Sequence, residues 1–563
     1  MLKLIKGVKQ NILNREFLST IFVLLGYQIF LFSGLILIIT IALFFLKIPI
    51  SVFILPISFV LSLILIALIN KKKIKLWTFS QWVTTIILFI AIYTISFLIS
   101  KHFYDVSWDG QEYHQSAILL LTDGHWNPIF EDITSSSYSG IWVQHYGKAS
   151  EILASSLVVI TKQIETGKIF NLLFIVGAFL LGTGTLWKFK TMNKWIAVLL
   201  TFVVVLNPVT IYQSLSYYVD GQLLSAILAI LFTGILFIKE KDNSVYLIWF
   251  MIGIIIINLK FTGILFAGIA CLVFLIYILF LKDKKIFWKT FFVCGLTGLI
   301  GILIIGFNPY VRNTLEFEHP FYPLAGENTR DIRSTQTPED LREVGYIRRA
   351  VISLFLLDHE GEDIIWRTPF TTNPESLELY RYADPRTGGF GVYFMEICAF
   401  SFILLIQMIL KKENKGLKYL LILELTCVVV AYIMMRDAYW GRYVPVIFIA
   451  PWAIMVYSFI LDNNKNRFLP RLVLFLFFVN MMIVGSMYLT DSTEGTNNVS
   501  GILKSVKNTS IVYIYSPYGQ FLNNTRRFDE NNIKYELIKD GEQWENMEGK
   551  DARFWNSEIY IKY

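Results

Sequence analysis

The chain has 563 residues, of which 55% are hydrophobic, 16% are aromatic and only 17% are charged. A water-soluble protein carries about a quarter charged residues, and many apolar runs here exceed the ~20 residues that cross a bilayer. The composition therefore excludes an ordinary soluble enzyme and predicts a polytopic α-helical membrane protein. The net charge of +7 does not indicate a nucleic-acid partner, because the lysines form short clusters between apolar segments.

The N-terminus and the cysteines indicate where the protein works. Residues 1–17 are basic but lack the short apolar region and small-residue cleavage site of a signal peptide, so we expect an uncleaved cytoplasmic start. The four cysteines lie inside apolar segments and show neither a disulfide framework nor zinc-site spacing. The abundance of Lys, Ile and Asn is typical of an AT-rich bacterial genome, so the expected location is a bacterial cytoplasmic membrane.

Hydropathy predicts about thirteen membrane-spanning helices. The first nine cover 18–46, 50–69, 78–100, 167–187, 195–213, 221–238, 244–257, 262–281 and 286–307. The tenth and eleventh lie on either side of KKENK at 411–415, the twelfth returns to NNKNR at 463–467, and the thirteenth ends at about 489. Long external loops, at about 101–166 and 308–389, follow the third and ninth spans.

Clusters of basic residues predict which side of the membrane is cytoplasmic. All of them fall on the same side of the predicted spans: 1–15, 71–75, 188–194, 239–241, 282–289, 411–418 and 465–471. Positive charge gathers on the cytoplasmic side, so that side and the N-terminus are assigned to the cytoplasm. The conspicuous polar motifs and the C-terminus then fall on the extracytoplasmic side, although the motifs were not used to choose the spans.

The C-terminal tail differs in composition from the rest of the chain. Residues 490–563 are polar, and SIVYIYSPY, NIKYELI and EIYIKY have the pattern of strands, with a helix expected near 518–531 between the first two. We therefore expect a transmembrane domain over 1–489 and a small extracytoplasmic α/β domain over 490–563.

The first external loop carries the densest polar stretch, YDVSWDGQEYHQ. It places Asp109, Glu112, Tyr113 and His114 just beyond an apolar segment, where polar groups are costly unless they are used. A helix starting at Gly110 would put Asp109 and Glu112 on one face. The alternative is that these acids only complement the positive end of a helix.

A second acid and scattered histidines also fall on the external side. Asp220, in YYVDG, is at the outer end of a predicted span, where a solvated interfacial carboxylate is the alternative explanation. The histidines His114, His125, His145 and His319 lack regular spacing, which favours hydrogen-bonded loop residues over metal ligands.

Four cations on the same side are candidates for binding phosphate. Lys260 lies in the short turn NLKFTG, where snorkelling to water is an equal alternative. Arg312 opens the second long loop, and a guanidinium pairs with phosphate oxygens in two-pronged fashion. Arg436 and Arg442 belong to MRDAYWGRY, although pairing with Asp437 also explains Arg436. No phosphate-cradling glycine loop or GxSxG elbow accompanies them.

Together these motifs resemble the GT-C superfamily of integral-membrane glycosyltransferases, which includes protein O-mannosyltransferases, the lipid A aminoarabinose transferase and the oligosaccharyltransferase catalytic subunit. The resemblance rests on Asp109 with Glu112 in SWDGQEYH, Asp220 in YYVDG and Arg442 in WGRYVP, and it covers most of 75–490. The chain departs from the pattern in two ways. The acidic loop follows the third predicted span instead of the first, and there is no clear DxD motif.

The resemblance implies transfer of a sugar, with inversion, from a polyprenyl-phosphate donor to an envelope glycan, lipid or protein. Asp109, with Glu112, would be catalytic, Asp109 acting as general base on the acceptor hydroxyl. Cations would stabilise the leaving lipid phosphate: Arg312, Lys260, Arg442 and Arg436. Residues that would serve the acceptor, or a second acidic role, are Asp220, His114, Tyr113 and His319. The metal requirement stays open between a divalent cation, Mg²⁺ or Mn²⁺, and none.

Three other functions remain as alternatives. A glycan polymerase or ligase also uses polyprenyl donors outside the cell, and the loop 308–389 leaves it open. A lipid-linked glycan transporter or flippase needs polar residues near the midplane of several spans, whereas the fourth, eighth and twelfth spans are almost uncharged. A structural scaffold would tolerate alanine in the acidic loop. The pattern favours a glycosyltransferase.

Overall fold

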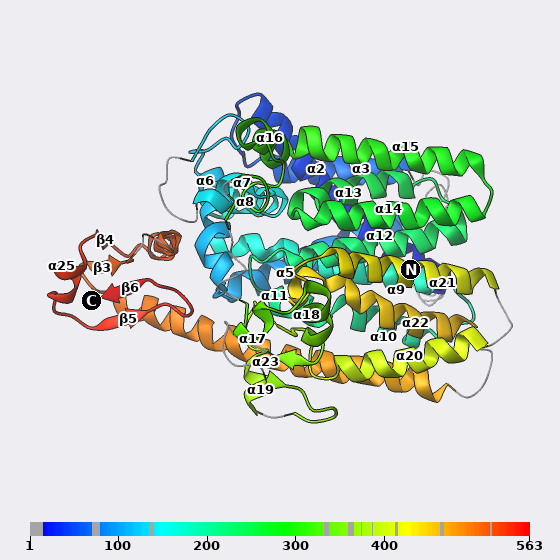
Figure 1. The fold of residues 1–563 in the computed structure, drawn as a ribbon. Coiled ribbons are helices and arrows are strands. Elements are labelled where there is room, and N and C mark those ends of the chain that lie inside the picture. Colours follow the sequence, from blue (N-terminus) through cyan, green and yellow to red (C-terminus); the bar gives the residue numbers. More distant parts are fainter. Residues whose placement is uncertain are drawn as a thin grey trace, which may run out of the picture.

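The long helices run side by side in one bundle, with smaller elements gathered at one end (Figure 1). The structure is a computed structural model, and it describes residues 15–69, 79–133, 140–327, 329–330, 337–357, 365–372, 374–385, 387–410, 415–461, 467–517, 519 and 521–563. The bundle helices are α2 (Arg15–Phe45), α3 (Ile54–Ile69), α5 (Phe79–His102), α9 (Ile169–Leu186), α10 (Lys194–Val205), α12 (Asp220–Glu240), α13 (Val245–Leu259), α14 (Thr262–Phe280), α15 (Lys284–Ile300), α20 (Phe394–Leu410), α21 (Lys415–Met434), α22 (Ile449–Leu461) and α23 (Phe468–Val506).

Seven helices among the described residues are long and apolar enough, by length and composition, to cross a membrane. This supports the predicted class, a polytopic helical membrane protein. A helix lies in each of the nine ranges given above for the first nine spans, but the number thirteen stays a prediction. The range 195–213 is broken: α10 ends at Val205, and Asn207 caps α11 (Pro208–Gln213) by accepting from Thr210 N. Asn before Pro starts a new helix here because Pro fits the first helical position.

Helix α2 is largely buried and packs against α9, α3 and α13. Two glycines make this packing possible. A Cβ at Gly26 would lie 2.5 Å from Leu181 Cγ, and a Cβ at Gly34 would lie 2.8 Å from Met251 Sδ. Small residues at helix contacts let backbones approach closely, which replaces the hydrophobic driving force that lipid does not supply.

The two ends of the bundle differ in charge. At one end Arg15 donates to Trp187 O, Lys188 pairs with Glu240 at 2.9 Å, and Lys289 of α15 donates to Asn243 at 2.9 Å. The basic clusters predicted at 71–75 and within 1–14, 411–414 and 465–466 lie outside the described residues. At the other end lie the predicted polar motifs, as their mutual contacts below show. Within the described residues, the basic groups and the polar motifs therefore lie at opposite ends of the bundle, as the sequence predicts.

Short elements lie in and beside the predicted external loops at this second end. They are η1 (Gly110–His114), α6 (Gln115–Thr122), α7 (Gly140–His145), α8 (Ala149–Thr161), η2 (Ile164–Lys168), η3 (Gly301–Ile305), η4 (Phe307–Val311), α16 (Arg312–Phe317), α17 (Glu339–Arg342), α18 (Tyr346–Ser353), β1 (Leu356–Leu357), β2 (Ile365–Trp366), α19 (Pro374–Glu378), η5 (Gly441–Tyr443) and η6 (Pro445–Phe448).

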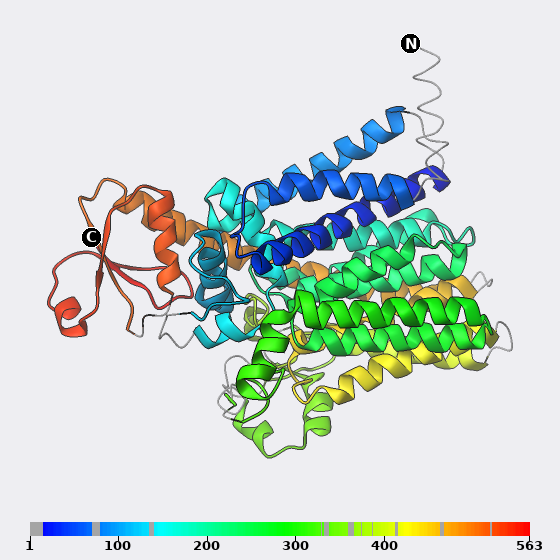
Figure 2. The same cartoon turned by 90° about the horizontal axis from the view of Figure 1, so that it is seen from above.

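Helix α23 continues for 39 residues through position 490, so the chain has no break at the predicted domain boundary. Its last turns enter a small domain that projects from the same end as α6, α7 and α8 (Figure 2). The predicted strands and helix are present in this domain, and a further strand, β5, was not predicted. Its elements are β3 (Val512–Tyr515), η7 (Leu522–Thr525), α24 (Arg526–Glu530), β4 (Tyr535–Ile538), α25 (Gly541–Glu545), β5 (Asp551–Arg553) and β6 (Tyr560–Lys562), with sheet order β4-β3-β6-β5.

A buried ionic network, which we call the Arg527 network, docks this domain on the bundle. Arg527 Nη2 lies 2.9 Å from Glu165 Oε1 and donates to Asp105 O at 2.6 Å, and Lys168 Nζ lies 2.5 Å from Glu165 Oε2. The Arg527 and Lys168 side chains are 0% exposed, and that of Glu165 is 5% exposed. The C-terminal domain therefore holds in place the loop that leads to Asp109.

Candidate functional site

Asp109 stands at the end of a loop whose shape is fixed by another aspartate. Asp105 accepts from the backbone and side chain of Ser107 at 2.9 and 2.6 Å and from Tyr217 N at 2.9 Å. A Cβ on Gly110 would lie 2.1 Å from Asp105 Oδ2, so only glycine allows this close approach. Asp109 follows as the N-cap of η1.

Arg442 joins Asp109 to an acid from the second long loop. Arg442 Nη1 lies 3.1 Å from Asp109 Oδ2, and Arg442 Nε lies 3.0 Å from Asp384 Oδ1. The guanidinium carbon is 4.9 Å from the centre of the Tyr218 ring and 5.1 Å from that of Tyr443. Burial opposes the charge, but Asp384 and the two phenols raise the pKa of Arg442 further above its ordinary value. The arginine is therefore a permanent cation in an aromatic setting.

Lys260 and Asp220 form the other half of the site. Lys260 lies between α13 and α14, and its Nζ is 2.6 Å from Asp220 Oδ1 and 4.1 Å from the centre of the Tyr443 ring. Gln213 donates to the second oxygen of Asp220 at 3.1 Å. Burial lowers the pKa of Lys260, although Asp220 works against that shift. Tyr443 thus lies against both cations, Lys260 and Arg442.

We call Asp109, Asp220, Lys260, Asp384 and Arg442 the Arg442 cluster. The structure brings together four of its members that the sequence predicted, from segments far apart in the chain. A fifth predicted residue, Tyr113, donates to Asp109 Oδ2 at 3.2 Å, and burial raises its pKa well above the ordinary value, so it is a neutral donor.

Two contributors were missed by sequence reasoning. Asp384 lies in RYADPRTGG, where nothing in the local sequence indicates a partner 58 residues further on. Tyr218 belongs to the motif YYVDG, which was selected only for its aspartate. Tyr443 was visible beside Arg442 in WGRYVP, and aromatic residues beside charged ones were the available signal.

Glu112 and His114 have no hydrogen bond or ion pair with the Arg442 cluster among the described residues. His114 Nδ1 lies 2.7 Å from Glu151 Oε1 in a buried pair. Glu112 is 6% exposed, and burial, helped by the negative charge of Asp109, raises its pKa to about 7. Its Oε1 finds no hydrogen-bond partner among the residues that the structure describes.

Arg312 belongs to a separate structural clasp. Its Nη1 donates to the carbonyls of Pro128 and Glu131 at 3.1 and 2.8 Å, and its Nη2 lies 2.6 Å from Asp132 and 2.8 Å from Glu316. All of these partners are protein groups from the two external loops. The guanidinium therefore links the two external loops. It makes no contact with the Arg442 cluster within the described part of the chain.

The two remaining predicted residues are also peripheral. His319 accepts from Phe321 N at 3.1 Å within its own turn and is half-buried. Arg436 is exposed just beyond the end of α21. Neither makes a contact with the Arg442 cluster within the described part of the chain.

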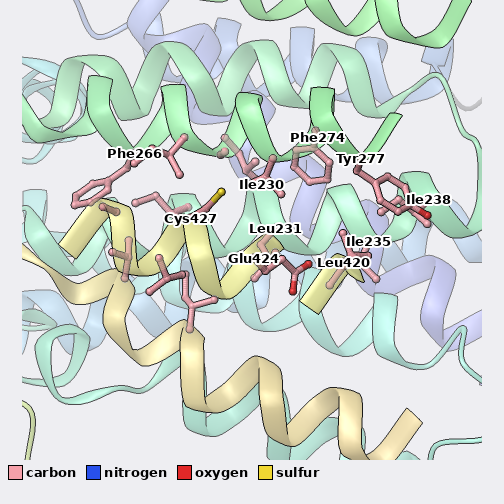
Figure 3. Close-up of a pocket in the computed structure, with 18 residues that line it drawn as sticks. Ile230, Leu231, Ile235, Ile238, Phe266, Phe274, Tyr277, Leu420, Glu424 and Cys427 are labelled. Atoms are coloured by element: carbon pink, nitrogen blue, oxygen red, sulfur yellow. The ribbon is translucent and has the colours of Figure 1, made fainter. Parts of the chain in front are cut away.

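An apolar groove lies between α12, α14 and α21 (Figure 3). Phe266 and Tyr277 mark its two ends on α14, while Cys427, Glu424 and Leu420 follow one another along α21. At the outer end the lining residues are close in sequence to the cluster. Val446 comes four residues after Arg442, and Phe266 six residues after Lys260.

No group of three or more His, Cys, Asp or Glu side chains is arranged to hold a metal ion within the described ranges. The carboxylates of Asp109, Asp220 and Asp384 each lie beside Lys260 or Arg442 instead. No family model matches the chain, and no curated protein sequence is significantly similar to it.

Proposed function

We propose that this protein is a GT-C-type glycosyltransferase that moves a sugar from a polyprenyl-phosphate donor to a cell-envelope acceptor. One observation carries the proposal. A groove with an almost wholly apolar lining approaches, at its outer end, a cluster that combines two cations with a carboxylate beside a phenol. A lipid phosphate has the same order of parts: a long apolar chain, a negative headgroup and a reacting carbon.

The groove suits the lipid part of such a donor. Its outer residues Ile227, Phe266 and Val446 stand about two turns or less along the chain from Asp220, Lys260 and Arg442 respectively. A chain lying between α12 and α14 would therefore place its phosphate near both cations. The bilayer around the groove is as apolar as the groove itself, so the tail gains van der Waals packing there, and the headgroup sets the position of the donor.

Lys260 and Arg442 are suited to the leaving phosphate. Asp220 holds Lys260 at 2.6 Å, and Asp384 and Asp109 hold Arg442, so neither cation must reorganise when charge develops. Fixed charges aimed at developing charge are usually the largest contribution to catalysis. Arg442 brings planar donors and Lys260 a point charge, and both are largely shielded from water.

Asp109 is suited to the proton transfer. Its Oδ2 is held by Arg442 and by the Tyr113 hydroxyl, and its side chain is still 20% exposed. In the proposed step the acceptor oxygen gives its proton to Asp109 and bonds to the anomeric carbon of the sugar. The bond between that carbon and the phosphate oxygen breaks, and polyprenyl phosphate leaves with the electron pair beside Lys260 and Arg442.

The proposed setting is the cytoplasmic membrane of a bacterium, with the Arg442 cluster and the C-terminal domain on the extracytoplasmic side. The basic residues at the opposite end of the bundle support this orientation by the positive-inside rule. A requirement for Mg²⁺ or Mn²⁺ stays open and is answered by transfer assays with and without chelator.

The test is transfer from a panel of synthetic polyprenyl-phosphate sugars to cell-envelope acceptors by the purified protein. Asp109→Asn keeps the size of the side chain and removes the base, so we expect transfer to fall about 10²- to 10⁴-fold. Asp123→Asn is the matched control, because Asp123 is an exposed acid in the same external loop, and it should retain wild-type transfer.

Each outcome is informative. Normal transfer by Asp109→Asn would remove Asp109 from catalysis and pass the role to Glu112 or Asp220. Growth of the donor glycan itself, with no other acceptor needed, would favour a polymerase or ligase. Absence of transfer from every donor, combined with movement of donor across vesicles, would contradict the enzyme and favour a transporter.

A further inference from the structure

The C-terminal domain closes against η1 along a seam that lies beside the Arg442 cluster. The ring of Phe521 meets that of Trp108 edge-on, with centroids 4.8 Å apart. Asn523, on η7, donates to the carbonyl of Gln111 and, at 3.4 Å, to Gln115 Oε1. Trp108 is the residue before Asp109, so the seam starts where the proposed base stands.

Polar atoms along this seam are buried without an evident use. Glu112 Oε1, Gln115 Nε2 and Asn523 Oδ1 find no hydrogen-bond partner among the described residues. Glu112 is 6% exposed and Gln115 is 0% exposed. Such atoms normally have partners, because leaving one buried and unpaired costs about 1–3 kcal/mol. Three of them on facing elements indicate a site that is completed by another molecule.

The kinds of group present define the chemistry of that molecule. Glu112 Oε1 and Asn523 Oδ1 accept hydrogen bonds and Gln115 Nε2 donates one, which suits a ligand with several hydroxyl groups. Trp108 is 41% exposed although it is a large aromatic residue, and its ring offers an apolar face. A sugar ring has one apolar face and a rim of hydroxyls, and it matches this set better than a lipid chain or a phosphate.

We propose that the seam between η1 and η7 is a binding site for a neutral sugar ring, with Trp108 under the ring and Glu112, Gln115 and Asn523 bonded to its hydroxyls. Its role as the acceptor site rests on the proposed glycosyltransferase function, and it narrows the acceptor class to a glycan.

The test is direct binding, so it does not depend on transfer. Saturation-transfer NMR would be recorded on the full chain in lipid nanodiscs with a panel of neutral mono- and disaccharides. We expect saturation to reach at least one sugar, Trp108→Ala to weaken that binding at least tenfold, and Asn523→Asp to weaken it a few fold. Trp366→Ala is the matched control, because Trp366 is 66% exposed on another loop, and it should bind like wild type.

The outcomes separate this inference from the proposed function. Absence of saturation for every sugar, or equal binding by wild type and Trp108→Ala at equal thermal stability, would overturn the sugar site. Release of polyprenyl phosphate from donor by the wild-type protein reports on the enzyme independently. Donor turnover without sugar binding would support the proposed enzyme and contradict the sugar site. Sugar binding without donor turnover would support the sugar site and contradict the proposed enzyme.

Discussion

Two ionic networks lie four residues apart in the chain, and they differ in how completely they are closed. The Arg527 network starts at Asp105, and its charged side chains are 0–5% exposed. The Arg442 cluster starts at Asp109, where the side chains of Asp109, Lys260 and Asp384 are 20%, 19% and 16% exposed. The charged side chains of the Arg527 network are enclosed by other protein groups, whereas those of the Arg442 cluster are partly exposed to solvent.

The difference indicates what each network does. In the Arg527 network the guanidinium is bonded to a carboxylate, a side-chain amide and a backbone carbonyl, so its donors are used in docking. Both networks place cations against aromatic rings: Arg527 lies over Tyr104 and Phe554, as Lys260 and Arg442 lie over Tyr443. The difference is exposure, because Lys260 is 19% exposed and can still attract an anion that arrives. The closed network holds the domain and the loop in place, and the open one is available for a ligand.

The largest effect on stability is expected from opening the closed network. Arg527→Met leaves Glu165 with only Lys168 as a cation in a buried site, and breaking such a pair costs about 3–5 kcal/mol. Denaturant unfolding and limited proteolysis should show release of the C-terminal domain before the bundle unfolds. Lys550→Met, at a cation outside the network, is the control. Equal unfolding of the two variants would contradict the docking role.

A somewhat smaller effect is expected at Glu112, and it depends on pH. Its pKa is raised from 4.5 to about 7, so between these values the folded protein keeps a proton that the unfolded chain loses. Stability from this group therefore falls as pH rises through that window, by on the order of 3 kcal/mol at pH 8. Glu112→Gln should match wild type at pH 4 and be more stable at pH 8. A difference that does not change with pH would contradict the raised pKa.

Variants at Lys260 and Arg312 distinguish a cation that binds the donor from a cation that only stabilises the fold. Lys260→Gln keeps a hydrogen bond to Asp220 but removes the charge, so we expect the donor KM to rise about tenfold, equivalent to about 1.4 kcal/mol. Arg312→Gln loosens the clasp to Asp132 and Glu316 and should lower the unfolding midpoint with little change in donor KM. Steady-state kinetics at several donor concentrations give the KM, and thermal unfolding gives the midpoint. A raised KM for Arg312→Gln with an unchanged KM for Lys260→Gln would contradict these roles.

The smallest effect is expected at Asp384. Asp384 positions Arg442 from 3.0 Å, but in the proposed step it meets neither the acceptor proton nor the leaving phosphate. Asp384→Asn leaves Arg442 bonded to Asp109, so transfer should fall no more than about fivefold. A loss as large as that of Asp109→Asn would mean that Asp384, and not Asp109, accepts the proton.

The sequence predicted the charged members of the site better than their partners. Asp109, Asp220, Lys260 and Arg442 could be selected because each follows or precedes an apolar run on the side opposite the basic clusters. The partner of a side chain could not be predicted, because the carboxylate beside Arg312 is 180 residues earlier in the chain. Hydropathy also did not indicate that α23 continues as a helix to Val506, after its residues become polar.

Only one side of the seam between η1 and η7 had a sequence signal. Trp108 and Glu112 were visible in the motif SWDGQEYH, but Phe521 and Asn523 belong to a tail that showed no recognisable constellation. Only the docking of the C-terminal domain by Arg527 places them opposite one another. Sites built between two domains depend on packing that local patterns do not record.

The most direct test of the central claim asks where the donor lipid lies. A polyprenyl-phosphate sugar with a photoreactive group in its lipid chain would be crosslinked to the protein in nanodiscs and the labelled peptides identified. We predict label on α12, α14 and α21, at positions such as Phe266 and Ala431, with less label in Lys260→Gln. A second apolar groove, lined by Ile38, Phe45 and Ile304 on the Arg312 side of the bundle, is the internal control. Label confined to that second groove would contradict the account.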